Sequence, residues 1–111
     1  MKYMMFVCTD TEPETDESPV PDIHTWVAEN DAKGRRLDGS VLAPVASATT
    51  VRVRGGELLI SDGPFAETKE VIAGYDILEC ADLDEAIEVA RAHPMAYGGR
   101  IELRAMVDLP E

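Results

Sequence analysis

Hydrophobic and polar positions along this chain follow two different periods, and the changes between them predict its elements. Short runs rich in apolar and β-forming residues predict strands at 2–8, 40–45, 49–54, 57–61, 71–80 and 101–107. Apolar residues at helical spacing predict one helix over about 21–33 and a second from Asp82 to a stop at Pro94. The chain is therefore expected to mix strands with two helices.

Local signals predict where several of these elements turn or begin. Gly55 and Gly56 join two β-rich runs, which predicts a β-hairpin because the turns that fit a hairpin need residues with positive φ. Asp82 and Glu85 have the spacing of a capping box and predict the start of the second helix. Gly34 is the expected stop of the first helix.

The order of elements is β-α-β-(hairpin)-β-α-β, which predicts an α+β, ferredoxin-like (split βαβ) fold with an inserted hairpin. It forms a single domain over residues 1–111. In such a sheet the first strand lies between strands 71–80 and 101–107, antiparallel to both. The end of the first strand, the start of the long strand and the start of the first helix then converge on one rim. Two helices cover one face of the sheet, so we expect a homodimer that buries the other.

Charge excludes one class of partner. The chain has 22 acidic and 10 basic residues and a formal net charge of −12. A nucleic-acid-binding surface needs clustered Lys and Arg, and the field of this chain would repel a polyanion. Five of the acids crowd into 10–17, which predicts a solvated loop. We therefore expect no nucleic-acid partner.

The remaining composition predicts a cytoplasmic protein without a metal or cofactor. The apolar run at the start of the chain is too short for a signal-peptide core or a membrane span, so no membrane partner is expected. Cys8 and Cys80 fall at opposite ends of neighbouring strands, which predicts buried, reduced thiols. A metal held by His24 and Asp62 alone would lack ligands.

The segment 62–70 reads DGPFAETKE, and it resembles the signature of the DGPF family within the YCII-related superfamily. The likeness extends to the opening Met-Lys-Tyr-Met and to segments 48–54 and 101–104. The resemblance implies a dimeric α+β barrel built from ferredoxin-like subunits, in a family of small bacterial proteins mostly without an assigned reaction. It also implies an association with extracytoplasmic-function sigma factors. One relative in the wider superfamily is a dehydrochlorinase that acts on a chlorinated aromatic compound.

The resemblance also implies site residues, because members of the wider superfamily have a histidine–aspartate pair in a pocket proposed to be catalytic. The aspartate corresponds to Asp62, and His24, at the start of the first helix, is its expected partner. His24 would act as a general base that Asp62 orients. Pro64, Lys69 and Arg100 are expected to contact substrate, Lys69 or Arg100 through an anionic group.

Structural interpretations of the same residues stay open. Asp62, Gly63 and Pro64 have the chemistry of a turn, in which Asp caps its own backbone and Gly takes positive φ. His24 can be a solvent-facing residue near a helix start. His93 is interpreted as a charge partner for the C-terminal end of the second helix, outside the site.

The function expected from these observations is binding of a small organic molecule, with lyase-like or isomerase-like proton transfer at a His/Asp site. An alternative is a non-enzymatic module that senses a ligand or binds a protein, linked to a sigma factor. A third interpretation is a dimer in which the segment 62–70 is purely structural.

Overall fold

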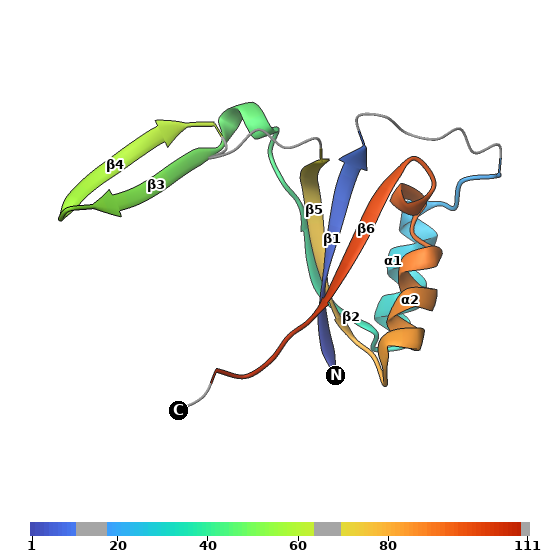
Figure 1. The fold of residues 1–111 in the computed structure, drawn as a ribbon. Helices are drawn as coiled ribbons and strands as arrows, with labels where there is room; N and C mark the ends of the chain where they lie inside the picture. Colours follow the sequence, from blue (N-terminus) through green and yellow to red (C-terminus); the bar gives the residue numbers. More distant parts are fainter. Residues whose placement is uncertain (11–17, 64–69, 110–111) are drawn as a thin grey trace.

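The structure is a computed structural model that describes residues 1–10, 18–63 and 70–109 (Figure 1). It contains two α-helices and six strands among these residues. They are β1 (Lys2–Asp10), α1 (Ile23–Ala32), β2 (Arg36–Val41), β3 (Thr49–Arg54), β4 (Glu57–Asp62), β5 (Glu70–Glu79), α2 (Leu83–Arg91) and β6 (Gly99–Ala105). Two short 3-10 turns are η1 (Val45–Ser47) and η2 (Pro94–Ala96). Neither helix is long and apolar enough to cross a membrane within the described residues.

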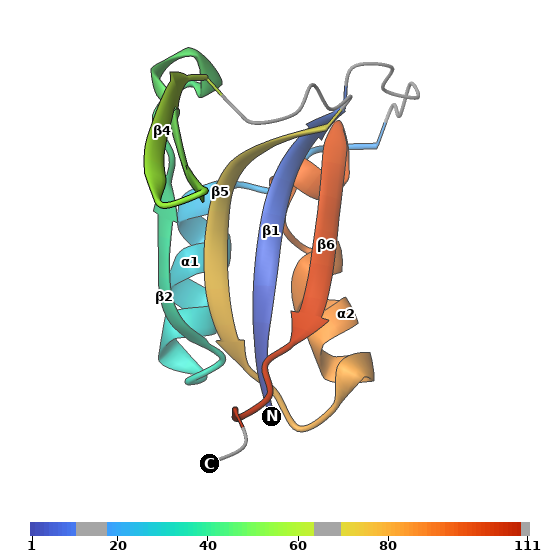
Figure 2. The ribbon, with the colours of Figure 1, turned by 60° about the vertical axis from the view of Figure 1, so that its left-hand side comes forward.

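Four strands form one antiparallel sheet in the order β2-β5-β1-β6, as the element order predicts. Both helices lie on the same side of this sheet, and the opposite side, called the open face below, carries no helix of the described residues (Figures 1 and 2). The result is a small α+β structure with antiparallel sheets. It is compatible with a ferredoxin-like fold, and the subunit is not a closed barrel.

The core lies between the sheet and the two helices. Alternate residues of β1 (Tyr3, Met5 and Val7) are buried there, and Leu78 of β5 is fully buried beside them. Trp26 is the main contribution of α1 to this core. This is the period-2 burial expected of strands covered on one side.

Capping determines where both helices begin. The Asp22 carboxylate accepts a hydrogen bond from the Thr25 backbone N–H at 3.0 Å, and Asp82 accepts one from Glu85 N–H at 2.9 Å. The Glu85 carboxylate in turn accepts from Ala81 N–H at 3.3 Å, one residue before the cap. The predicted start of the second helix is therefore confirmed.

The second strand lies earlier than predicted. The expectation was 40–45, but β2 runs over Arg36–Val41, and the chain then leaves the sheet through η1. The predicted bounds, taken from the apolar run, are wrong. Strand β2 is an edge strand, and its position is set by its pairing with β5, which places Gly39 opposite Asp76. Val41 and Leu42, which suggested a strand centre, are exposed.

Strands β3 and β4 form a separate two-stranded sheet that projects away from the rest of the molecule (Figure 1). Gly55 and Gly56 form its turn with φ of 58° and 77°, as a hairpin turn with two positive φ values requires. The register places Val51 opposite Ile60 and Val53 opposite Leu58.

Candidate functional site

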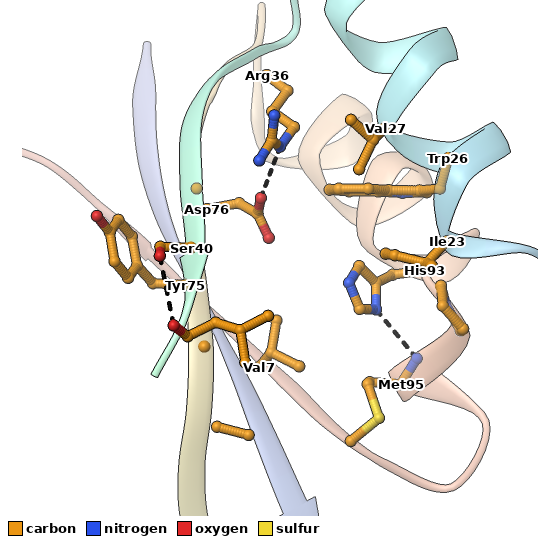
Figure 3. Close-up of a pocket in the computed structure, with 15 residues that line it drawn as sticks. Val7, Ile23, Trp26, Val27, Arg36, Ser40, Tyr75, Asp76, His93 and Met95 are labelled. Carbon is orange, nitrogen blue, oxygen red and sulfur yellow. Dashed lines mark hydrogen bonds and ion pairs between the residues drawn. The ribbon is translucent and has the colours of Figure 1, made fainter. Parts of the chain in front are cut away.

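A cavity of about 560 Å3 lies between α1, η2 and the covered side of the sheet (Figure 3). Most of its lining is apolar. The apolar side chains on its wall include Val7, Ile23, Trp26, Val27, Val41, Pro94 and Met95. Arg36, Asp76 and His93 bring ionisable side chains to it, and Ser40 and Tyr75 also border it. Its size and its mixture of an apolar wall with a few polar groups are typical of small-molecule sites.

Trp26 forms the part of the wall contributed by α1. It is 3% exposed, and its indole N–H donates a hydrogen bond to the Val89 carbonyl of α2 at 2.8 Å. The His93 ring packs edge-on against it, with ring centroids 4.7 Å apart and an interplanar angle of 76°. Trp26 therefore fastens α1 to α2 and at the same time holds His93 in place.

The tautomer of His93 follows from its position as the N-cap of η2. Its Nδ1 accepts a hydrogen bond from the Met95 backbone N–H at 3.0 Å, so the neutral ring carries its proton on Nε2. Nε2 has no hydrogen-bond partner among the described residues, and the ring edge that bears it faces the cavity (Figure 3). Burial lowers the pKa of His93 to about 4, so the ring is neutral at pH 7.

Asp76 and Arg36 form an ion pair on the opposite wall. Arg36 Nε donates to Asp76 Oδ1 at 2.8 Å, and its Nη1 lies 3.2 Å from Asp31 Oδ1. Burial raises the pKa of Asp76, and the hydrogen bond from Arg36 opposes that rise. The same hydrogen bond raises the pKa of Arg36. Because Arg36 already forms ion pairs with two carboxylates, its charge is not available to bind an anionic ligand.

Gly39 creates the room that this ion pair needs. A Cβ at position 39 would overlap Asp76 Oδ1 and would lie 2.7 Å from the Arg36 guanidinium. The glycine lies directly opposite Asp76 in the β2–β5 register. A residue with any side chain there would push the carboxylate or the guanidinium out of place.

Besides the Arg36–Asp76 ion pair, the cavity presents a hydrogen-bond donor and an acceptor within an apolar enclosure. The donor is His93 Nε2–H. The acceptor is Asp76 Oδ2, which has no hydrogen bond within the described part of the chain. In Figure 3 both groups are directed into the cavity, from α2–η2 and from β5 respectively. Such an arrangement suits a ligand atom that accepts and donates a hydrogen bond at once.

The residues predicted from the sequence lie elsewhere. His24 is exposed on the first turn of α1, and Asp62 is exposed at the end of β4, on the other side of the main sheet (Figure 1). No hydrogen bond or ion pair joins the two within the described residues, and neither lines the cavity. Gly63 does take the expected positive φ, at 86°.

Arg100 is engaged with another residue, and two predicted contacts cannot be placed. Arg100 Nε donates to Asp10 Oδ2 at 2.7 Å, between β6 and the end of β1. Pro64 and Lys69 lie outside the described residues. The substrate-contact role of all three stays a prediction.

The rim chosen from the topology nevertheless coincides with the site. The register pairs Asp10 with Glu70 and Val41 with Gly74, so the end of β1, the start of β5 and the end of β2 meet at one end of the sheet. The cavity opens among these segments and the start of α1. The location was predictable, whereas the residues that give it chemistry were not.

The interpretation of His93 as a charge partner for the C-terminal end of the second helix is wrong, because the buried ring is neutral at pH 7 and caps η2. A proline directly after the histidine was the available signal, since His-Pro fits the start of a new turn better than the end of the old helix. Asp76 could also have been noticed, as a carboxylate in the otherwise uncharged interior of a strand that has glutamates only at its two ends.

A family model described as the YCII-related domain matches residues 1–110. The chain belongs to the YCII-related family. The narrower resemblance to the DGPF family stays a prediction.

A curated relative that is similar to this YCII-related protein has no assigned activity. An uncharacterized protein of Rhizobium meliloti (strain 1021) is 50% identical over 50 residues, which make up 45% of this chain and 40% of the relative. The matched part spans less than half of that protein. Within the described residues, no group of three or more His, Cys, Asp or Glu side chains could hold a metal ion.

Proposed function

We propose that this YCII-related protein binds a small, uncharged, largely apolar molecule with a hydroxyl group, in the cavity between α1, η2 and the sheet. The single observation that carries the proposal is that a neutral His93 and Asp76 line the same apolar cavity of about 560 Å3. A hydroxyl group can accept from His93 Nε2–H and donate to Asp76 Oδ2. Naphthol-sized aromatic alcohols fit both this chemistry and this volume.

Charge argues against an ionic ligand. Arg36 neutralises Asp76 and is shared with Asp31, so the wall offers no unpaired cation for a carboxylate. The net charge of −12 adds a field that repels anions. An ammonium group can donate to Asp76 but has no lone pair, so it would leave His93 Nε2–H without an acceptor.

Isothermal titration with three matched molecules tests this proposal. We expect 2-naphthol to bind, and 2-naphthoate and 2-(aminomethyl)naphthalene to bind at least tenfold more weakly. His93→Asn and Asp76→Asn should each weaken 2-naphthol about tenfold, or about 1.4 kcal/mol. His24→Asn is the matched control for the other histidine of the chain and should leave binding unchanged. Equal binding of all three molecules would contradict the proposal.

We further propose that two copies pair through the open face of the main sheet. Alternate residues Met4 and Phe6 of β1 and their register partners Ile77 and Tyr75 of β5 project from it and are half-buried. No helix covers them (Figure 2). Arg104, whose guanidinium lies 5.8 Å from the Phe6 ring centroid, extends the same surface. Sedimentation velocity tests the pairing, because a monomer at micromolar concentration would contradict it.

The proton-transfer role of His24 and Asp62 is a separate proposal, derived from the family resemblance. Its support is that both residues border the same end of the sheet. A double-mutant cycle with His24→Asn and Asp62→Asn tests it. A coupling in the free energy of unfolding above about 0.5 kcal/mol supports contact between the two side chains. A coupling of zero would argue against contact.

The alternative is a module that senses a ligand and acts with a sigma factor. Its only support is the resemblance to the DGPF family. Retention of a sigma factor on the immobilised protein, with and without 2-naphthol, is the direct test.

A further inference from the structure

The β3–β4 hairpin is an unusual element for a molecule of this size because little of it is covered. It projects from one end of the main sheet on the side of the open face (Figure 1). The radius of gyration is 16.3 Å, whereas a compact domain of this length has about 13 Å. A hairpin of two strands is marginally stable by itself and needs a third strand or a packed face.

One side of this hairpin is apolar over its outer part, and it ends next to the main sheet in the polar pair Thr49 and Asp62. We call the apolar part the arm face, and its residues are Val51, Val53, Leu58 and Ile60. They share one side because cross-strand partners and residues two apart in a strand project in the same direction. Each is between 58% and 61% exposed. Together they present roughly 400 Å2 of apolar surface, as much as the largest patch of a typical monomer.

A second uncovered apolar segment lies at the opposite end of the open face. After β6, residues 106–109 continue away from the sheet on the same side as the hairpin (Figure 1). Val107 and Leu109, two apart, are 82% and 87% exposed. Met106 N–H still donates to the Lys2 carbonyl, but Val107–Leu109 belongs to no strand.

We propose that the arm face of each copy packs on residues 106–109 of the other copy. This inference rests on the proposed pairing through the open face. A twofold axis that crosses the strands at right angles brings the hairpin end of one sheet to the C-terminal end of the other. Each of the two uncovered segments is then buried at two symmetry-related places in the dimer, and residues 106–109 supply the packed face that the hairpin lacks.

Charge favours a second copy at these segments. Two chains of net charge −12 repel each other over most of their surfaces. Within the hairpin, Arg52 and Arg54 balance Glu57 and Asp62, and residues 106–109 carry one charge, on Asp108. The hairpin and residues 106–109 are therefore surfaces on which two copies can meet with little electrostatic repulsion. A second copy of the chain is always present where the first is made, so it can cover the apolar side of the hairpin at all times.

The first test is sedimentation velocity of a variant with all four arm-face residues changed to Thr, which keeps a high strand propensity. We expect its dimer dissociation constant to rise at least tenfold. The matched control is Leu83→Gln with Ile87→Gln, which removes exposed apolar side chains from α2 on the covered side. Fluorescence of Trp26 reports that the body remains folded, since this buried residue belongs to α1, which lies on the opposite side of the main sheet from the hairpin (Figure 1).

The second test distinguishes which segments meet. Leu58→Cys and Val107→Cys chains, mixed and oxidised, should form a cross-linked heterodimer, whereas Leu58→Cys alone should not cross-link. The native Cys8 and Cys80 are buried and do not compete.

The outcomes separate this inference from the proposed dimer. A wild-type monomer would overturn both. A dimer that keeps its affinity in the arm-face variant, or Leu58→Cys chains that cross-link to each other, would overturn the arm inference alone.

Discussion

His93 makes the stability of the protein sensitive to mildly acidic pH. In the unfolded chain its pKa is about 6.5, and in the folded protein burial lowers it to about 4. Between these values the unfolded chain binds a proton that the folded protein does not. The stabilisation is therefore complete above pH 6.5 and is lost as the pH falls towards 4.

The size of the effect follows from the two pKa values. At pH 5 the loss relative to pH 7.5 is about 2 kcal/mol, and it approaches about 3 kcal/mol near pH 4. The cost has a structural cause. A protonated His93 loses the acceptor for the Met95 N–H and places a charge against Trp26 in an apolar enclosure.

Urea unfolding at pH 7.5 and at pH 5 measures this loss. Other groups also titrate, so the informative quantity is the difference between wild type and His93→Asn, in which the amide oxygen still accepts from Met95. We expect the variant to lose about 2 kcal/mol less than wild type over this interval. His24→Asn, which changes an exposed histidine, should behave as wild type. Equal losses in wild type and His93→Asn would refute the assignment of a buried neutral imidazole.

Three further substitutions test the packing around the site and the helix ends, each by urea unfolding. Gly39→Ala should cost about 2 kcal/mol because its Cβ overlaps the Asp76 carboxylate, whereas Gly98→Ala, with nothing within 4 Å, should change stability by less than about 0.5 kcal/mol. Trp26→Phe should cost about 2 kcal/mol because it removes the hydrogen bond to a buried carbonyl; a near-neutral result would mean that this bond is not formed. Asp82→Ala should cost about 1 kcal/mol through loss of the N-cap, and clearly more than Asp84→Ala two residues later.

Much of the fold was predictable because its signals are local. The alternating burial of β1, the two glycines of the hairpin turn and the Asp82 cap each depend on residues close in sequence. Strand order followed from the sequence of elements, since few topologies connect them without crossings. These signals also predicted the rim at which the cavity lies.

The chemistry of the site depends on residues that are distant in sequence, and it was not predictable in the same way. Arg36 and Asp76 are separated by 40 positions, and their ion pair exists only because β2 pairs with β5. The same pairing places β2 at Arg36–Val41, so that it starts before the apolar run 40–45 that had predicted it. His93 is buried because the turn after α2 folds back against Trp26. The apolar spacing that predicts a helix up to Pro94 contains no sign of this contact.

The central claim, that a neutral hydroxyl-bearing molecule binds between Trp26, His93 and Asp76, has one direct test. The chain contains a single tryptophan, so its indole N–H gives one resonance in a nitrogen–proton correlation spectrum. On titration with 2-naphthol we predict a saturable shift of this resonance, together with that of the Met95 N–H. The same addition of 2-naphthoate should leave both nearly unmoved. Shifts confined to other parts of the protein, or equal shifts with the two molecules, would contradict the account.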